Sequence, residues 1–219
     1  MTGTVAGMDD QVLATDGRVI GTRAQLTRRR LLDATAKVLG QHGVLDVKVV
    51  DITREVGTSP ATFYQYFSDV EDAILALADD AVEDVKPLTQ HLTASWAGPD
   101  GMVHIAALVD GYVTYWDEHQ AIIRVRNLKA EEGDSRFRAS RLRAYTQLMA
   151  GLVEQVKAGQ AAGHVSTDLD PYATAAAMSA ILERLIPYRA ELGRRGVTDD
   201  ALRATIATIF RLVLTGRRG

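Results

Sequence analysis

Residues 47–67 read VKVVDITREVGTSPATFYQYF, and this stretch decides the fold. A short amphipathic helix is expected near 47–55, and the run Gly57-Thr58-Ser59 interrupts it. Ser59 can cap a second helix through its side-chain oxygen, and Pro60 suits the first helical position, where no backbone N–H is needed. Two short helices joined by a glycine-containing turn of three or four residues have the geometry of a helix-turn-helix.

The second helix, expected to run to about Phe67, is rich in aromatic residues. Phe63 and Phe67 are four positions apart and share one face, so they can pack into a small core. Tyr64 and Tyr66 flank that face, and their hydroxyls can point outward. An ordinary amphipathic helix with its aromatic side chains in a core is the alternative interpretation, and the aromatic residues alone favour it. The turn, the cap and a basic preceding helix together favour a DNA-binding helix.

The preceding helix is expected over residues 22–41, with Gly43 at its end. Its inward-facing positions are Leu31, Leu32, Thr35, Val38 and Leu39. The formal net charge of the chain is −3, but residues 18–55 hold eight basic and four acidic side chains. This concentration of basic groups favours a surface for nucleic acid on the N-terminal part, and a solvated helix face is the alternative.

Helical spacing recurs along the rest of the chain, and no stretch alternates as a half-buried strand does. We therefore predict an all-α protein of about nine helices, in which a three-helix helix-turn-helix domain precedes a helical bundle. The expected domains are a flexible tail at 1–21, the helix-turn-helix domain at 22–68, and a domain for effector binding and dimerisation at 69–219. The later helices are expected at about 70–86, 102–117, 120–130, 136–161, 171–189 and from 199 onward.

The composition argues against an enzyme. There are no cysteines, which excludes disulfides, thiolate metal sites and cysteine nucleophiles. The five histidines are scattered without a metal-binding or catalytic spacing, so we predict no catalytic residue, no metal and no cofactor. No run of about 18 apolar residues occurs, so no membrane partner is expected. The lack of cysteine also suits a cytoplasmic location.

Three segments resemble a known family of proteins. They read TRRRLLDATAKVLGQHG (27–43), DITREVGTSPATFYQYF (51–67) and EDAIL (71–75). Together they are similar to the N-terminal signature of the TetR family of transcriptional regulators, over about residues 24–77. The C-terminal part is similar to that family in helix pattern alone, with a layout closest to the subgroup of the mycobacterial ethionamide-resistance regulator.

The resemblance implies a role in DNA binding for ten residues of the first three helices. Phosphate contacts fix the register of such a protein on DNA, and contacts to base edges give sequence choice. The residues implied to hold phosphates are Ser59, Thr62, Tyr64 and Tyr66. Those implied to lie nearest base edges are Pro60, Ala61 and Gln65. Those implied to touch the DNA backbone from the first two helices are Thr27, Arg28 and Lys48.

The sequence departs from the family pattern at several positions. The family has Thr or Ser where Lys48 stands, so Asp46 is the alternative cap for the second helix. The family often has Lys where Val70 stands, which removes one phosphate contact. Thr53, Val56 and Thr58 replace Ala, Ala and Val, which are modest changes in packing.

The resemblance also implies an effector pocket inside the C-terminal bundle. The apolar and aromatic residues there suit an apolar or amphipathic small molecule, and methionine can fill irregular space. An ordinary core made of the same stripes is the alternative. The candidate ligand-binding residues are Ile105, Val109, Tyr112, Trp116, Asn127, Tyr145, Met149, Leu152, Met178, Ser179 and Leu182.

A homodimer made by the last two long helices is a further implication. A self-complementary contact of four helices follows from two-fold symmetry, and packing of the same stripe within one chain is the alternative. The candidate interface residues are Ala176, Leu202, Ile206, Ile209, Phe210 and Val213.

The function expected from these features is that of a repressor that binds a palindromic double-stranded DNA operator as a dimer. Its two recognition helices would fit half-sites about 34–36 Å apart. A small effector that binds better to a wrongly spaced dimer would release the operator, with the helix near 70–86 as the lever. A helical ligand-binding or adaptor protein with a degenerate helix-turn-helix is the alternative function.

Overall fold

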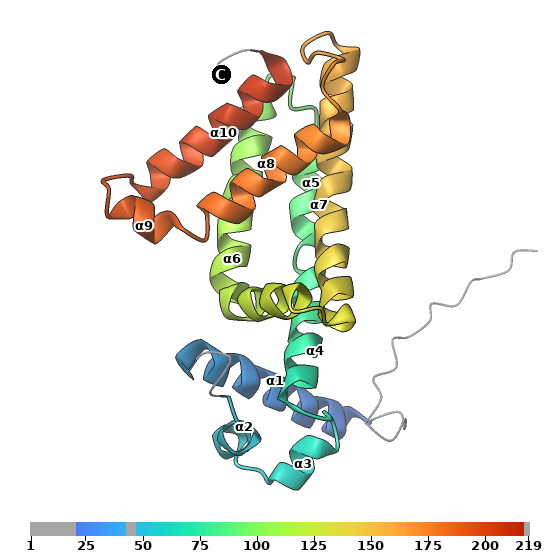
Figure 1. The fold of residues 1–219 in the computed structure, drawn as a ribbon, viewed down its shortest axis with the longest axis vertical. Helices are drawn as coiled ribbons and strands as arrows, with labels where there is room; N and C mark the ends of the chain where they lie inside the picture. Colours follow the sequence, from blue (N-terminus) through green and yellow to red (C-terminus); the bar gives the residue numbers. More distant parts are fainter. Residues whose placement is uncertain (1–20, 43–46, 217–219) are drawn as a thin grey trace, which may run out of the picture. The chain divides into compact units, whose positions relative to one another are not determined.

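The computed structural model describes residues 21–42 and 47–216, and these residues are all-helical. The predicted fold class is therefore confirmed. Nearly all of the tail predicted at 1–21, together with Gly43 and Asp46, lies outside the described residues. The described ranges hold ten helices, against about nine expected: α1 (Thr22–His42), α2 (Val49–Val56), α3 (Pro60–Tyr64), α4 (Val70–Glu83), α5 (Lys86–Thr93), α6 (Gly101–Glu131), α7 (Ser135–Ala161), α8 (Pro171–Leu185), α9 (Arg189–Gly193) and α10 (Asp199–Thr215) (Figure 1).

The chain divides into two compact units, of which one ends at Leu77 and the other begins at Ala78. In the first unit, α1 packs against α2 and α2 packs against α3. The side chains buried in its core include Leu31, Leu32, Ile52, Phe63 and Phe67. Removing these large apolar groups from water is the main force that holds these helices together.

The second unit is a helical bundle built on the two longest helices, α6 and α7, which pack against each other. Helix α8 packs on α7, α10 packs on α6, and α5 packs on both long helices. Two glycines allow α5 to approach so closely. A Cβ atom at Gly151 of α7 would lie 2.6 Å from the Cβ of Leu92, and one at Gly111 of α6 would lie 2.4 Å from a methyl carbon of Leu88. Larger residues at these positions would push α5 outward.

Three predicted helix boundaries are wrong. The helices expected at 102–117 and 120–130 form the single helix α6, because residues 117–120 contain no glycine or proline to interrupt its hydrogen bonds. The last part of α6 turns away from the direction of the first part (Figure 1). The segment 86–93 forms a separate helix, α5, with Pro87 in its first turn, where proline is tolerated. Helix α8 ends at Leu185 rather than near Arg189.

Within the described ranges, no helix combines the length and the apolar character needed to cross a membrane.

Candidate DNA-binding surface and effector cavity

The turn between α2 and α3 depends on a glycine. Gly57 has φ +71° and ends α2 in the left-handed conformation, which residues with a Cβ atom rarely adopt. Its N–H donates to the carbonyl of Arg54 at 3.2 Å, and the N–H of Thr58 donates to the carbonyl of Thr53 at 2.9 Å. These bonds satisfy carbonyl groups at the end of α2. The glycine-containing turn predicted from the sequence is confirmed.

Ser59 begins the second helix of the motif, as predicted. Its backbone is extended, and its Oγ accepts a hydrogen bond from the N–H of Thr62 at 3.3 Å. The two hydroxyls of Ser59 and Thr62 also lie 3.1 Å apart. Pro60 occupies the first turn. The helix is shorter than predicted, because α3 ends at Tyr64 and a single further turn carries the chain to Phe67, whose N–H donates to the carbonyl of Phe63 at 3.0 Å.

The aromatic residues of this segment divide between the core and the surface. Phe63 and Phe67 are buried, with ring centroids 5.4 Å apart. Tyr64 is 52% exposed, and its ring stands edge-on to Phe63. The other candidate DNA-binding residues of the segment also reach the surface: Ser59, Pro60, Ala61 and Gln65 are exposed, and Thr62 and Tyr66 are half-buried. The predicted recognition residues thus lie at the surface of the unit, around the buried Phe63 and Phe67.

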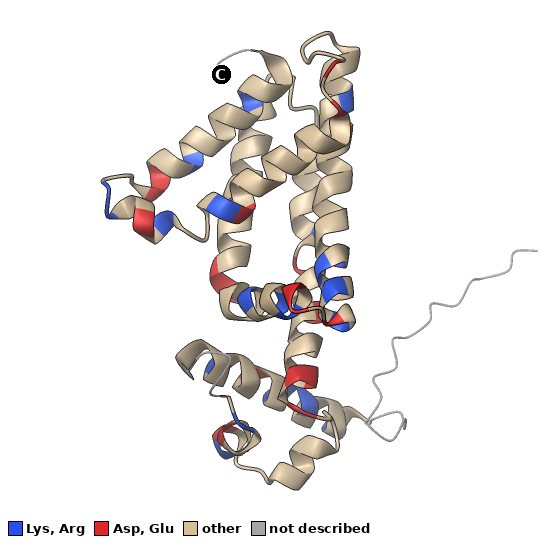
Figure 2. Cartoon of the chain, in the orientation of Figure 1, with Lys and Arg blue, Asp and Glu red and all other residues tan. Residues whose placement is uncertain are grey.

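Most basic groups of this unit have partners within it. The guanidinium of Arg28 lies over the ring of Phe67, and Arg30 donates to the carbonyl of Val56 at 2.9 Å. The ion pairs of α1 and α2 join Arg29 to Asp33, Lys37 to Glu55, and Arg54 to Asp51. Figure 2 shows basic and acidic residues interspersed on these helices. The positive charge read from the sequence is therefore partly neutralised by neighbouring carboxylates.

Lys48 and Thr27 are the remaining candidates outside α3. Lys48 is exposed at the N-cap position of α2 and makes no capping hydrogen bond through its side chain. The alternative cap, Asp46, lies outside the described residues. Thr27 is half-buried on α1, and its hydroxyl donates to the carbonyl of Arg23 at 3.1 Å.

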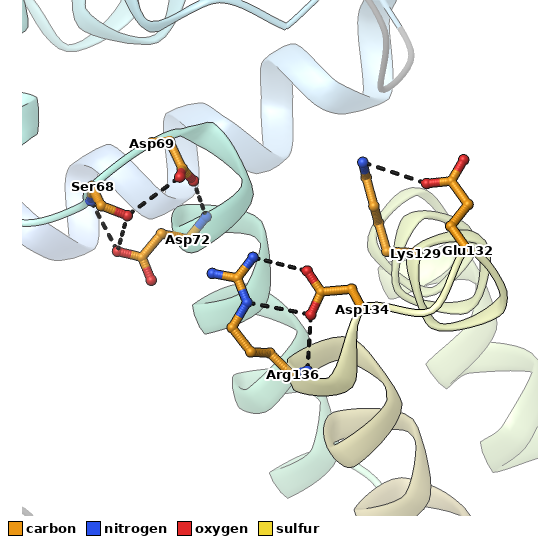
Figure 3. Close-up of polar contacts among 7 residues, drawn as sticks. All are labelled: Ser68, Asp69, Asp72, Lys129, Glu132, Asp134 and Arg136. Atoms are coloured by element: carbon orange, nitrogen blue, oxygen red, sulfur yellow. Dashed lines mark hydrogen bonds and ion pairs between the residues drawn. The ribbon is translucent and has the colours of Figure 1, made fainter.

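The start of α4 is fixed by acidic residues (Figure 3). The carboxylate of Asp69 accepts a hydrogen bond from the N–H of Asp72 at 2.7 Å, and the carboxylate of Asp72 accepts one from the N–H of Ser68 at 3.0 Å. These two bonds satisfy the amide of Asp72 in the first turn of α4 and the amide of Ser68 just before the helix. Val70, where the family often has Lys, is half-buried in the first turn of α4.

The second unit contains a cavity of about 530 Å³ between α5, α6, α7 and α8. Its volume falls in the range of small-molecule sites. Its lining combines apolar and aromatic walls with arginines and glutamates: Val85, Leu88, Tyr112, Tyr115, Trp116, Ile123, Arg126, Asn127, Glu131, Arg138, Arg141, Leu142, Ala144, Tyr145, Leu148 and Glu183.

Four of the candidate ligand-binding residues line this cavity, namely Tyr112, Trp116, Asn127 and Tyr145. The other candidates are buried in the surrounding core and do not line it: Ile105, Val109, Met149, Leu152, Met178, Ser179 and Leu182. Helical spacing identifies the stripe that turns inward, but it does not tell which inward residues meet empty space. The charged lining residues are not evident from the sequence, because a charged residue within a helix shows no sign of burial.

The polar groups of the cavity are distributed unevenly. Arg126 is 6% exposed, and its Nε lies 3.3 Å from the Oδ1 of Asn127. Glu183 accepts a hydrogen bond from the hydroxyl of Ser179 at 2.8 Å, and Glu131 lies 3.9 Å from Arg141. Burial raises the pKa of both Tyr112 and Tyr115 above the ordinary value. Both phenols are therefore neutral hydrogen-bond donors at any physiological pH.

The candidate dimer residues fall into two groups. Leu202, Ile206 and Phe210 are buried within the chain, where Phe210 stacks against Trp96 with ring centroids 6.2 Å apart. In this conformation they are not available to a second copy. For these three residues the structure agrees with the alternative interpretation, in which the stripe packs within one chain. Ala176, Ile209 and Val213 are half-buried.

Comparison with protein families identifies both parts of the chain. Residues 31–77 match the bacterial regulatory proteins of the tetR family, and residues 88–219 match the tetracyclin repressor-like C-terminal domain. The chain belongs to the TetR family. It is a transcriptional regulator with a helix-turn-helix DNA-binding domain, in a family that is not enzymatic.

Relatives of this TetR-family regulator match it over different extents. The HTH-type transcriptional regulator BetI of Brucella anthropi is 47% identical over 51 residues, which are 23% of this chain and 26% of BetI. The chain thus matches only about a quarter of the length of that relative.

Solved structures share the fold over most of the chain. FadR of Bacillus subtilis, in complex with stearoyl-CoA, is 14% identical and has a TM-score of 0.64, covering 87% of this chain and 99% of FadR. A Saccharomonospora viridis protein in complex with choline is 22% identical and has a TM-score of 0.67. The match covers 83% of this chain and 94% of that protein. At these identities the likeness concerns the fold.

Proposed function

We propose that this TetR-family regulator is a cytoplasmic repressor that binds a palindromic operator as a homodimer and is released by a small apolar or amphipathic effector. The exposed face of α3 carries the first half of this proposal. The Ser59 cap fixes where the helix begins, and the buried Phe63 and Phe67 fix its rotation. The residues left outside are Tyr64, Gln65, Pro60 and Ala61, which are short or amphipathic enough to approach a groove.

The cavity supports the second half of the proposal. It offers about 530 Å³ lined by aromatic and apolar side chains with a few polar groups, which is the usual character of a small-molecule site. FadR of Bacillus subtilis and the Saccharomonospora viridis protein were each solved with a small molecule. Their ligands differ in charge and size, so they support a small-molecule effector and do not define its chemistry in this chain.

The dimer contact that we propose uses the outer faces of α8 and α10. Ala173 and Ala177 are exposed on α8, and Leu212 is exposed on α10 beside the half-buried Ile209 and Val213. Small residues on one helix and branched apolar residues on the next allow four helices to pack closely about a two-fold axis. Ala176 joins this surface.

Linkage between effector and operator follows from the thermodynamics of two sites. An effector that binds better to a dimer with wrongly spaced recognition helices must weaken operator binding by the same factor. Among the described helices, α4 alone contributes residues to both compact units. We therefore assign to α4 the role of lever that the sequence suggests for residues 70–86.

Selection of bound fragments from a random DNA pool tests the proposal directly. We expect an inverted repeat with half-site centres separated by about one helical turn or a multiple of it. Affinity for the selected operator should fall steeply as salt rises, since phosphate contacts release counterions. A pool that shows no enriched repeat would argue against the proposed function.

One observation favours the alternative of a ligand-binding or adaptor protein with a degenerate helix-turn-helix. Several basic groups of α1 and α2 are paired with carboxylates, and Val70 replaces a frequent lysine. In that case the selection would enrich no fragment, while ligand binding in the cavity would persist.

A further inference from the structure

Arg126 is a permanently charged group inside the cavity that lacks an anionic partner. It lies in the C-terminal part of the long helix α6, five residues before its end, and it is 6% exposed. Its Nη1 is buried without a hydrogen-bond partner among the described residues. Its Nε lies near the neutral amide oxygen of Asn127. A guanidinium in such a place is costly, because burial removes its hydration and no ion pair replaces it.

The acidic residues of the cavity are in contact with other groups. Glu183 is hydrogen-bonded to Ser179, and Glu131 lies closest to Arg141. Within residues 21–42 and 47–216, Arg126 forms no ion pair with a carboxylate. The lining as a whole holds three arginines and two glutamates, so it carries an excess of positive charge.

Tyr115 supplies a second unsatisfied group beside Arg126. Its hydroxyl is buried and has no hydrogen-bond partner of good geometry among the described residues. Both residues line the cavity, and burial raises the pKa of this phenol while the charge of Arg126 and the nearness of its guanidinium act in the opposite direction. Tyr115 is therefore a neutral donor next to a charged one. Two adjacent buried donors are a suitable arrangement for the two oxygens of a carboxylate.

The remainder of the cavity is apolar. Val85, Leu88 and Leu148 form aliphatic walls, and Trp116 provides an aromatic wall. We propose that the effector is an amphipathic organic anion, whose carboxylate is held by Arg126 and Tyr115 and whose apolar body lies along these walls. The regulatory role of this anion rests on the proposed function, whereas its binding in the cavity does not.

The aromatic residues of the cavity could also bind a different ligand, a quaternary ammonium ion. Tyr112, Trp116 and Tyr145 line the cavity together with Tyr115, and aromatic faces attract such cations. However, a buried guanidinium repels a cation in a medium of low dielectric constant. The structure therefore favours the anion, and the cation becomes an arm of the test.

Isothermal titration calorimetry with matched compounds tests the proposal on the full chain. The probes are octanoate, decanoate and dodecanoate, their methyl esters, and alkyltrimethylammonium ions of the same chain lengths. We expect a carboxylate to bind at least about tenfold more tightly than its ester, the size of one charge-assisted hydrogen bond. Equal affinity for acid and ester, preference for the ammonium ion, or no binding of any probe would overturn the proposal.

Two variants locate the binding group. Arg126→Met should weaken the best carboxylate by about 10- to 100-fold and change ester binding by less than about threefold. Tyr115→Phe should weaken the carboxylate by a few-fold, about the value of one neutral hydrogen bond. Arg195→Met is the matched control, since Arg195 is an exposed arginine of the same unit and does not line the cavity.

Far-ultraviolet circular dichroism of each variant shows whether it is folded. If Arg126→Met does not fold, the proposal is still tested by Tyr115→Phe and by the ratio of acid affinity to ester affinity in the native chain. Unchanged carboxylate affinity in a folded Arg126→Met would overturn the proposal. A carboxylate that binds as predicted but does not release the selected operator would leave the ligand class standing and would contradict the proposed function.

Discussion

The guanidinium of Arg28 lies over the ring of Phe67, 5.1 Å from its centroid. Arg28 is on α1 and Phe67 follows α3, so the contact joins the two ends of the helix-turn-helix unit. Cation–π contacts contribute about 0.5–1 kcal/mol at exposed sites and more when desolvated. The family resemblance assigns Arg28 to the DNA backbone, but the structure gives this side chain a role in packing as well. The two roles can be separated by experiment.

Arg28→Ala and Lys48→Ala should therefore differ. We expect Arg28→Ala to lower the free energy of unfolding by about 1 kcal/mol, because it removes the contact with Phe67. Lys48→Ala should leave stability within about 0.5 kcal/mol, because Lys48 is exposed and makes no capping bond. The slope of the logarithm of DNA affinity against the logarithm of salt concentration should become shallower by about one, the value for one lost phosphate contact. Urea unfolding and fluorescence anisotropy with a labelled operator measure these quantities; a stable Arg28→Ala would contradict the packing role.

Tyr64 offers a second test of the DNA-binding face. Tyr64→Ala should weaken operator and nonspecific DNA alike, because a phosphate contact carries no sequence information. Tyr64→Phe keeps the edge-on contact with Phe63 and removes the hydroxyl alone, so it should account for about a three- to tenfold loss. Tyr188→Phe, at an exposed tyrosine of the second unit, is the control. Unchanged affinity of Tyr64→Ala in a salt-controlled shift assay would show that Tyr64 is not a phosphate contact.

The proposed dimer surface can be disrupted by one charge. Ile209→Glu or Val213→Glu would place a carboxylate in an apolar contact between copies, so we expect monomers in analytical ultracentrifugation. Loss of the second recognition helix should then weaken operator binding by about 100-fold or more. Ala204→Glu adds the same charge at an exposed position elsewhere on α10 and should remain dimeric. A dimer that survives both Ile209→Glu and Val213→Glu must use a different surface.

The parts of this molecule that the sequence predicts are those that depend on neighbouring residues. The helix-turn-helix is specified by Gly57, Ser59 and Pro60 within a few positions, so its turn and cap can be read directly. The continuity of α6 is harder to read, because the apolar pattern weakens near residues 117–120 although nothing there breaks a helix. The start of α2 is only slightly misplaced by the sequence. The helix begins at Val49 rather than near residue 47, although Lys48 at its N-cap makes no capping hydrogen bond.

The cavity depends on contacts between helices that are distant in sequence. The predicted residues Tyr112 and Trp116 line it, but Met149 and Met178 belong to the core around it. All four lie on inward-facing stripes of their helices, and which of them meets empty space is decided by how α6, α7 and α8 cross. The burial of Arg126 without an ion pair could not be read from the sequence. It depends on α7 and α8 packing beside α6.

Replacing Arg126 should stabilise the protein in the absence of a ligand. Arg126→Met fills similar space and removes a buried charge that has no anionic partner, so we expect the free energy of unfolding to rise by about 1–3 kcal/mol. Urea unfolding monitored by circular dichroism measures this change, with Arg195→Met, at an exposed arginine of the same unit, as the control for loss of a positive charge. A clear loss of stability in Arg126→Met would mean that the guanidinium has a favourable partner in the folded chain.

Asp134 provides a test of local electrostatics at the start of α7. Its carboxylate accepts hydrogen bonds from the side chain and the backbone N–H of Arg136 (Figure 3), and the side-chain bond is the main cause that lowers the pKa of Asp134 from 3.8 to about 2. Because the folded pKa is the lower one, the cap contributes fully above pH 3.8 and is lost as the pH falls through about 2. Carbon-13 NMR of the side-chain carboxyl group measures this titration. Arg136→Gln should move the pKa back toward 3.8, while Arg143→Gln, which removes an arginine paired with Asp79 instead, should leave it unchanged. An Asp134 that titrates near 3.8 in the native chain would show that the Arg136 contact does not persist in solution.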